Sequence, residues 1–243
     1  DSHDEMEELG LIFNDMTVKV KDYLDITIKQ EKEKSELELD VLMMQINPHF
    51  IYNTLTSIIY LARKDKNEDI IHLTKDFITI LQDISRIGNG ESYAKLYEEI
   101  DVSKKYISVQ TYRYPDKFVV SWDIDEKLLN CIVPKTILQP LIENAIYHGF
   151  SELDKIGMIH IRIYEDNGII IDVSDNGVGM NVHKYNNQFS GDDFSKRGMR
   201  SIGINNILRR IQLAYGTDFG IDIESEDKKG TKITVHIPIV YYY

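Results

Sequence analysis

The chain has 243 residues, of which 42% are hydrophobic and 28% charged, as is ordinary for a globular protein of one or two domains. Its formal net charge of −12 argues against a nucleic-acid partner, because binding phosphates would need a basic stripe that the sequence lacks. The one cysteine, Cys131, excludes an internal disulfide and a cysteine-based zinc site, and no apolar run approaches the ~20 residues of a membrane span.

Residues 4–64 show an almost unbroken helical pattern. Apolar side chains recur there at steps of three and four residues, as in a coiled-coil seam: Leu9, Ile12, Met16, Val20 and Tyr23. The chain begins at Asp1 rather than at a methionine, and this pattern starts almost at once. We therefore expect a piece of a longer protein.

A polar turn over residues 63–69 separates this region from a second predicted helix, which the glycines at 88–90 end. The second helix carries its apolar residues on one side: Ile70, Leu73, Phe77, Leu81 and Ile84. Two antiparallel helices of this kind each bury only one side, so they need a partner. A second copy of the chain, completing a dimeric four-helix bundle, is the simplest one.

The remaining chain predicts an α+β domain of about 150 residues. Helical patterns cover residues 96–114, 135–149 and 201–215, and alternating strands cover residues 118–125, 158–175 and 219–239. Asn167-Gly168 is a typical turn for the hairpin over residues 158–175. The polar residues 181–201 have no periodicity and suit a mobile lid.

His49 stands apart from the apolar side of its predicted helix. At 100° per residue it lies half a revolution from Ile58 and shares its side with Asn53 and Thr56. Pro48 should bend the helix beside it. The pattern leaves two interpretations open, an exposed histidine without a role or a reactive one. An imidazole with a pKa near ~6.5 is largely neutral and would suit attack on a phosphoryl group.

Three patches of the second domain could bind the donor of such a group. "LIENAIYHG" places Glu143, Asn144 and His148 on a helix. Taken alone, these residues are more simply interpreted as the polar side of an amphipathic helix. "DVSDNGVGM" ends a largely apolar strand at Asp175, with Gly177 allowing close backbone approach. Alone it could be a hairpin turn, but polar residues follow it instead of a returning strand.

The third patch, "SIGINNI", places Gly203 at a helix start, where free N–H groups and the helix dipole attract anions. Lys196, Arg197 and Arg200 in the preceding segment add positive charge. The order of the three patches, with the polar segment between the second and the third, favours a nucleotide site more strongly than any one of them.

The chain resembles sensor histidine kinases of the LytS/YesM type. The stretches "QINPHFIYN", "LQPLIENAIYHG", "DNGVGM" and "SIGINNILRRIQLAYG" look like the H, N, G1 and G2 boxes of that family, in order, and the similarity covers residues 41–240. "EMEELGLIFNDMTVKVKDYL" looks like the closing helix of a HAMP module. The resemblance implies a dimeric helical-hairpin domain, forming a four-helix bundle, followed by a Bergerat-fold α/β sandwich. It divides the chain into residues 1–36, 37–90 and 91–243.

The resemblance assigns roles to matching positions. His49 matches the phosphorylated histidine, and Asn144 the asparagine that binds Mg2+ on the ATP phosphates, with His148 and Gly149 in the same box. Asp175 matches the acceptor of the adenine amino hydrogen, beside Gly177 and Gly179. The lid cations Lys196, Arg197 and Arg200 and the G2 residues Gly203 and Asn206 lie near the phosphates.

Two departures bear on the chemistry. Many histidine kinases carry an acidic residue after the phosphorylated histidine, where this chain has Phe50, as LytS/YesM-type sequences do. The group that takes the imidazole proton is therefore open, and Asn53 is placed to orient the ring or a hydrolytic water. Bergerat-fold hydrolases hold a glutamate four residues before the metal-binding asparagine, where this chain has Pro140. Glu143, next to Asn144, faces elsewhere, so direct ATP hydrolysis is disfavoured.

These features predict the cytoplasmic core of a bacterial cell-membrane protein, tethered by segments outside this chain. It would use ATP and Mg2+ to phosphorylate His49 and pass the phosphoryl group to an aspartate of a response-regulator receiver domain. Two alternatives stay open: a Bergerat-fold ATPase without a phosphoprotein, and a degenerate kinase that serves as a dimeric scaffold.

Overall fold

The computed structural model describes residues 16–30, 32, 48–88, 91–150, 155–179 and 202–241. The chain forms two units, residues 1–41 and 42–243. In the first unit, residues 16–30 form a helix, as predicted, and all its large apolar side chains are exposed: Met16, Val18, Val20, Tyr23, Leu24, Ile26 and Ile28. Within the described ranges, no helix combines the length and the hydropathy that crossing a membrane requires.

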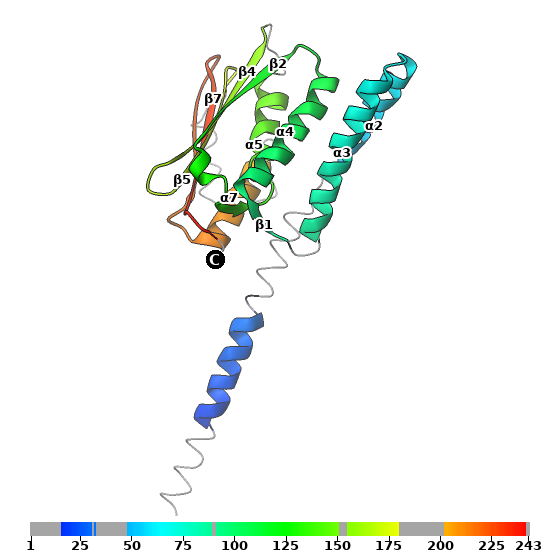
Figure 1. Ribbon diagram of the computed structural model, residues 1–243. Coiled ribbons are helices and arrows are strands. Elements are labelled where there is room, and N and C mark those ends of the chain that lie inside the picture. Colours follow the sequence, from blue (N-terminus) through cyan, green and yellow to red (C-terminus); the bar gives the residue numbers. More distant parts are fainter. Residues whose placement is uncertain are drawn as a thin grey trace, which may run out of the picture. The chain divides into compact units, whose positions relative to one another are not determined.

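The second unit begins with a helical hairpin of α2 (Pro48–Arg63) and α3 (Asn67–Gly88), drawn in Figure 1. The expected polar turn joins them, and Asp65 adopts a left-handed conformation in it, with φ 55°. Pro48 occupies the first turn of α2, where its missing N–H costs no intrahelical bond. The residues before it lie outside the described ranges, so the predicted bend stays a prediction.

The apolar side predicted for α2 is divided between two surroundings. Phe50 is buried, whereas Leu55 and Ile59 are about half exposed. The hairpin packs its buried side against α4 (Leu96–Arg113) of the following domain, where the Phe50 and Tyr106 rings meet. We expected a second copy of the chain to cover the hairpin, but α4 covers one side of it within the same chain. The exposed apolar residues of α2 remain for another partner.

A five-stranded mixed sheet forms the centre of the second domain (Figure 1). Its strands, in spatial order, are β2 (Phe118–Ile124), β4 (Gly157–Glu165), β5 (Ile169–Asp175), β7 (Gly230–Ile237) and β6 (Gly220–Glu226). β2 runs parallel to β4 and the other neighbours are antiparallel. The hairpin β4–β5 confirms the one predicted from Asn167-Gly168, and β6–β7 confirms the strands predicted over residues 219–239. A small ladder of β1 (Tyr93–Lys95) and β3 (Ile132–Pro134) stands beside the sheet, and a 3-10 turn η1 (Glu126–Leu128) follows β2.

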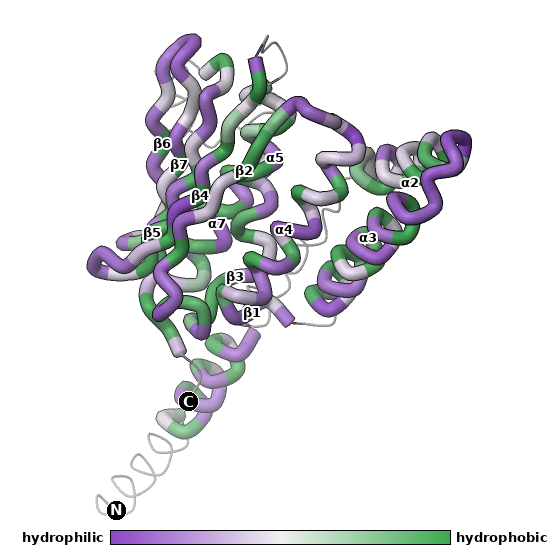
Figure 2. The backbone as a smooth tube through the Cα atoms, turned by 45° about the horizontal axis from the view of Figure 1, so that its top comes forward, coloured by the Kyte–Doolittle hydropathy of each residue, from purple (hydrophilic) through white to green (hydrophobic). Residues whose placement is uncertain are grey.

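Helices cover one face of this sheet, namely α4, α5 (Gln139–Asn144) and α7 (Ile202–Tyr215), as Figure 1 shows. The alternation of β4 explains why. Ile159, Ile161 and Ile163 are buried, while His160 and Arg162 between them are exposed. The tube in Figure 2 shows the same alternation of hydrophobic and hydrophilic positions along the strands. Among the described residues, the domain therefore has one helical layer, and the other face of the sheet carries no helix.

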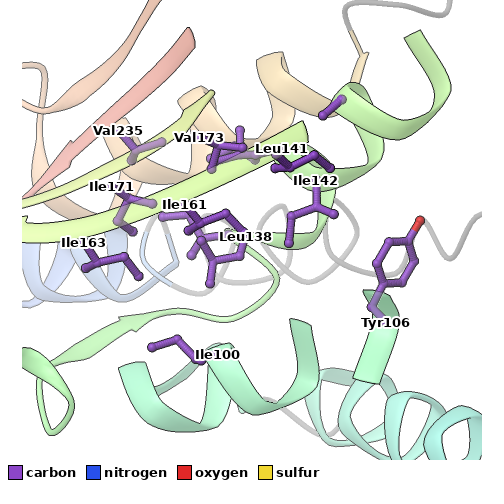
Figure 3. Close-up of a cluster of buried hydrophobic side chains, with 14 of the residues drawn as sticks. Ile100, Tyr106, Leu138, Leu141, Ile142, Ile161, Ile163, Ile171, Val173 and Val235 are labelled. Carbon is purple, nitrogen blue, oxygen red and sulfur yellow. The ribbon is translucent and has the colours of Figure 1, made fainter. Parts of the chain in front are cut away.

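The core lies between the sheet and that helical layer (Figure 3). Aliphatic side chains of α5 meet those of the strands, and all are almost completely buried: Leu138, Leu141, Ile142, Ile161, Ile163, Ile171, Val173 and Val235. α7 adds Ile204, Ile207 and Ile211. Burial of each such side chain contributes on the order of 1.5–3 kcal/mol, so this layer holds α5 firmly on the sheet.

Residues 135–149 depart from the continuous helix that we predicted. Ile132–Pro134 form β3, Thr136 has a left-handed φ of 54°, and α5 begins only at Gln139. Pro140 lies in the first turn of α5, where proline is tolerated. The last five residues form a π-helical turn, η2 (Ala145–Gly149), a feature frequent at functional sites. The wider turn ends with the backbone of Gly149 beside the end of β5, as described below.

Candidate functional site: a glycine-lined carboxylate

Asp175 is the last residue of β5 and pairs with Ile159 of β4 and Thr231 of β7. One carboxylate oxygen, Oδ1, accepts a hydrogen bond of 2.8 Å from the N–H of Gly177. Burial raises the pKa of Asp175 above its usual value, and the N–H groups of Gly177 and Thr231 oppose this shift. A carboxylate is thus fixed at a strand end, where it can accept a hydrogen bond from a ligand.

Glycine backbone approaches this carboxylate without intervening side chains. A Cβ at Gly149 would lie 3.0 Å from Oδ1 of Asp175, and one at Gly177 would overlap the backbone of Gly149. The N–H of Val178 donates to the carbonyl of Gly149 at 2.9 Å, which locks the two segments together. Gly179 has a φ of 68°, a conformation that favours glycine. Gly149 and Gly177 therefore form a cradle of bare backbone at Asp175, whereas a Cβ at Gly179 would overlap the backbone carbonyl of Glu226 instead.

Asn144 ends α5, directly before the π-helical turn that leads to Gly149. Its side chain is buried, with 8% exposed. The same short segment thus carries Asn144 and closes the cradle at Asp175. His148 lies in the π-helical turn, but its side chain lies outside the described part of the structure.

The start of α7 lies beside the start of α5. A Cβ at Gly203 would be in ordinary contact with Cβ of Pro140, at 3.6 Å. Asn206, also predicted, lies one turn further along α7 and is partly buried. The structure therefore brings the third sequence patch next to the first. The predicted lid and its cations Lys196, Arg197 and Arg200 fall outside the described residues.

His49 lies in the first turn of α2, and its side chain is likewise outside the described part. Thr56, on the same predicted side of the helix, is exposed, as we expected. Asn53 is partly buried, and its Nδ2 is fully enclosed with no hydrogen-bond acceptor among the described residues. A buried amide without an acceptor costs stability, on the order of 1–3 kcal/mol.

The sequence did not predict the polar contacts that α4 makes with α5 and with the π-helical turn after it. Glu143 accepts a hydrogen bond of 3.0 Å from the hydroxyl of Tyr106 on α4, so it does face away from the site. Tyr147 receives one of 2.8 Å from Arg113, also on α4. No short sequence motif indicates these hydrogen bonds, because 34 to 37 residues separate the partners. A tyrosine in an apolar helix face, with its hydroxyl needing a partner, was the only signal.

A second network holds the segment before α5. Both carboxylate oxygens of Glu99 accept backbone N–H groups, from Thr136 at 2.9 Å and Leu138 at 3.0 Å. Arg210 of α7 donates to the hydroxyl of Thr136 at 3.1 Å and to the carbonyl of Lys135. The left-handed turn at Thr136 is therefore fixed from α4 and from α7, and with it the direction in which α5 leaves.

The described residues fit a nucleotide better than a metal held by protein alone. Among them, no group of three or more His, Cys, Asp or Glu side chains comes together as a cation site. A metal ion near Asn144 would therefore take its remaining ligands from phosphate and water, as Mg2+ commonly does. The carboxylate of Asp175, reached over bare glycine backbone, suits the amino group of a flat base.

Two family models match the chain. Residues 37–118 match the one described as "Histidine kinase", and residues 132–240 match "Histidine kinase-, DNA gyrase B-, and HSP90-like ATPase". The first match spans the hairpin and α4, which pack together. The second spans α5, the cradle and α7. Between them they include nearly all of the second structural unit.

Curated relatives agree with these matches. "Sensor histidine kinase YesM" of Bacillus subtilis (strain 168) is 32% identical over 98% of this chain and 39% of its own length. "Sensor protein LytS" of Staphylococcus saprophyticus is 32% identical over 84% of this chain and 34% of its own. YwpD of Bacillus subtilis (strain 168) is 31% identical over 84% of this chain and 71% of its own.

The chain thus spans between a third and two fifths of the two sensor proteins. Its helical hairpin lies in the first matched range, and its glycine-lined carboxylate lies in the second. The chain therefore belongs to the histidine kinase family, and to the branch that contains the YesM and LytS sensor kinases.

Proposed function

We propose that this chain is the catalytic core of a sensor histidine kinase that transfers the terminal phosphoryl group of ATP to His49 and then to an aspartate of a response regulator. The observation that carries this proposal is the cradle at Asp175, where Gly149 and Gly177 bring bare backbone up to a carboxylate at the end of β5. It stands in a chain whose preceding hairpin carries a histidine in the first turn of α2.

The residue roles follow from the cradle. Asp175 would accept the amino hydrogen of adenine, with Gly177 and Gly179 shaping the backbone around the base. Asn144 would hold Mg2+ against the ATP phosphates. When bound there, the ion would supply neutralisation of the negative charge on the phosphates. The proposed nucleotide-binding set is completed by residues that would surround the phosphates and the base: His148, Gly149, Gly203, Asn206 and the lid cations Lys196, Arg197 and Arg200.

Two features favour transfer to a histidine over hydrolysis. Pro140 stands at the position where a water-activating glutamate would be needed, and it has no basic group. The carboxylate of Glu143 is bonded to Tyr106 on the side facing α4, so it is directed away from the cradle. The ATPase alternative thus lacks a base among the residues of α5.

We further propose that two chains associate through the hairpin and through residues 16–30. Exposed apolar residues lie on α2 and α3 on the side that α4 leaves uncovered: Tyr52, Leu55, Ile59, Ile71 and Ile78. The exposed apolar residues of the helix over 16–30 support a two-stranded coiled coil. Residues 1–36 would be the HAMP-like linker, 37–90 the dimerisation and phosphoacceptor domain, and 91–243 the ATP-binding domain.

In this proposal the chain is the cytoplasmic part of a bacterial membrane protein, with the sensing and anchoring parts outside it. The test is incubation with γ-labelled ATP and Mg2+, followed by measurement of acid-labile label on the protein. Wild type and His72→Ala, which removes an exposed histidine of α3, should take up label at the same rate. His49→Ala and Asp175→Asn should take up none. Phosphate release without label would instead indicate an ATPase, and absence of ATP binding a scaffold.

A further inference from the structure

Tyr106 contacts both the helix of His49 and the helix of Asn144. Its ring is completely buried and packs against Phe50, with ring centroids 5.2 Å apart and an interplanar angle of 34°. Its hydroxyl donates a hydrogen bond of 3.0 Å to Oε1 of Glu143. Phe50 directly follows His49 in α2, and Glu143 directly precedes Asn144 in α5. One side chain therefore lies between the two segments that must cooperate in phosphoryl transfer.

The Tyr106 hydroxyl is held in place from both sides. Nε2 of Gln110, one turn further along α4, donates to it at 2.7 Å. The same nitrogen lies 3.1 Å from the hydroxyl of Tyr147, which also accepts from Arg113. Tyr147 belongs to the π-helical turn. Side chains of α4 therefore form hydrogen bonds with residues on both sides of Asn144, namely Glu143 and Tyr147. Figure 3 shows the Tyr106 ring rising from α4 beside the aliphatic cluster that holds α5 on the sheet.

The carboxylate of Glu143 accepts hydrogen bonds from two uncharged groups, the hydroxyl of Tyr106 and the side-chain amide of Gln139. Oε1 of Glu143 also accepts a hydrogen bond of 3.2 Å from Nε2 of Gln139. Burial raises the pKa of Glu143, and the bonds from Gln139 and Tyr106 oppose the rise. A hydrogen bond to a charged, largely desolvated oxygen contributes about 1.5–3 kcal/mol, more than a bond between neutral groups.

We propose that Tyr106 is a positioning residue for phosphoryl transfer, which fixes the phosphoacceptor helix against the metal-binding end of α5 through Phe50 on one side and Glu143 on the other. The inference rests on the proposed kinase function. Phenylalanine at this position would fill the same space, so packing alone does not require the hydroxyl. Burying a hydroxyl costs free energy unless it is bonded, and here it bonds the residue next to Asn144.

The test compares Tyr106→Phe with wild type by the rate of His49 labelling over a range of ATP concentrations. The variant keeps the ring against Phe50 and loses the bond to Glu143. The rate at saturating ATP should fall by about 10- to 100-fold, the equivalent of one such hydrogen bond. The ATP concentration giving half the maximal rate should stay within about twofold, because Asp175 and its glycines are untouched.

Tyr112→Phe is the matched control. Tyr112 lies on the same helix and its hydroxyl also bonds a carboxylate, but that carboxylate is Asp69 of α3. Loss of this bond leaves the contact between α4 and α5 intact. The labelling rate of Tyr112→Phe should therefore remain within about twofold of wild type, since surface bonds of this kind contribute little. A fall as large as that of Tyr106→Phe would overturn the proposal.

Two further variants separate positioning from a role of the charge. Glu143→Gln keeps an oxygen that accepts from Tyr106 and should retain at least about a third of the wild-type rate, whereas Glu143→Leu should be as slow as Tyr106→Phe. The proposal is overturned by a Glu143→Gln rate as low as that of Glu143→Leu, or by a Tyr106→Phe rate equal to wild type. It is also overturned if the ATP requirement of Tyr106→Phe rises as much as its rate falls. Failure of the kinase function itself would appear separately, as absence of label in wild type.

Discussion

The ammonium group of Lys135 lies 3.1 Å from a carboxylate oxygen of Asp83, and the two side chains are only 5% and 14% exposed. Asp83 belongs to α3 of the hairpin, and Lys135 follows β3 in the segment from which α5 starts. Glu91 lies 3.3 Å from the same ammonium but is more exposed. The ion pair thus ties the hairpin to the segment from which α5 starts, at a second point away from Phe50 and Tyr106.

Removing either partner of this ion pair should lower the free energy of unfolding, by different amounts. Lys135→Met leaves a mostly buried carboxylate without its cation and should cost about 3 kcal/mol. Asp83→Asn leaves Lys135 with Glu91 and should cost about 1–2 kcal/mol. Lys66→Met, which removes an exposed ion pair with Asp69, should change stability by less than about 0.5 kcal/mol. Urea unfolding measures all three, and equal costs for Lys135→Met and Lys66→Met would contradict this account.

The buried carboxyl group of Glu99 should make stability depend on pH. Burial raises its pKa from 4.5 to about 7, with Asp83 acting in the same direction, while the N–H groups of Leu138 and Thr136 oppose the shift. The folded protein therefore binds this proton more tightly than the unfolded chain. The resulting stabilisation is fully present below pH 4.5 and is lost as the pH rises through about 7.

Glu99→Gln removes this titration and isolates its effect. Gln offers one acceptor oxygen where Glu99 uses two, so the variant should be less stable than wild type at pH 4.5. The difference should shrink by up to about 3 kcal/mol as the pH is raised to 8, because only wild type loses the proton. Urea unfolding at several pH values checks this. A stability difference that is constant, or that widens with pH, would show that Glu99 is ionised throughout.

Asn53 should trade stability against function. Its enclosed Nδ2 has no acceptor among the described residues, so Asn53→Leu removes an unpaired donor and should raise the free energy of unfolding by about 1 kcal/mol. If Asn53 orients the imidazole or a water one turn away, the variant should also change the lifetime of label on His49 several-fold. If Asn53→Leu is less stable than wild type and its label has the same lifetime, Asn53 has no role at His49.

Charge on the exposed apolar side of α2 should dissociate the proposed dimer. Leu55 and Ile59 are 45% and 55% exposed in the single chain. A carboxylate in a packed helical seam is strongly unfavourable, so Leu55→Asp and Ile59→Asp should raise the dimer dissociation constant by at least about 100-fold. Thr111→Asp, at an exposed position of α4 outside this surface, should change it little. Sedimentation would decide, and dimers of unchanged strength in Leu55→Asp would place the interface elsewhere.

Much of the fold follows from local patterns in the sequence. The alternation in β4 and the Asn167-Gly168 turn predicted the first hairpin, and the structure has it with antiparallel pairing. The one-sided apolar residues of α3 predicted its buried face, since Leu73 and Phe77 are among the most buried residues of the hairpin. Both signals are local, because period and turn chemistry depend on neighbours in the chain.

Contacts between distant residues were beyond such reasoning. The left-handed Thr136 depends on Glu99 and on Arg210, which lies 74 residues further along the chain, so the predicted helix over residues 135–149 was too long at its start. Phe50 follows His49 in the sequence, but nothing in its position indicated Tyr106 as the partner. The boxes named Gly149, Asp175 and Gly177, which the structure brings together, whereas no motif indicated the hydrogen bonds of Glu143 and Glu99.

The most direct test of the central claim is the location and amount of phosphohistidine after reaction with ATP and Mg2+. Tandem mass spectrometry under alkaline conditions should find phosphate on the peptide that contains His49, in wild type and in His72→Ala alike. Its amount should fall to background in Asp175→Asn, which keeps His49 but alters the cradle. Phosphate on a different residue, or undiminished phosphate on His49 in Asp175→Asn, would contradict the account.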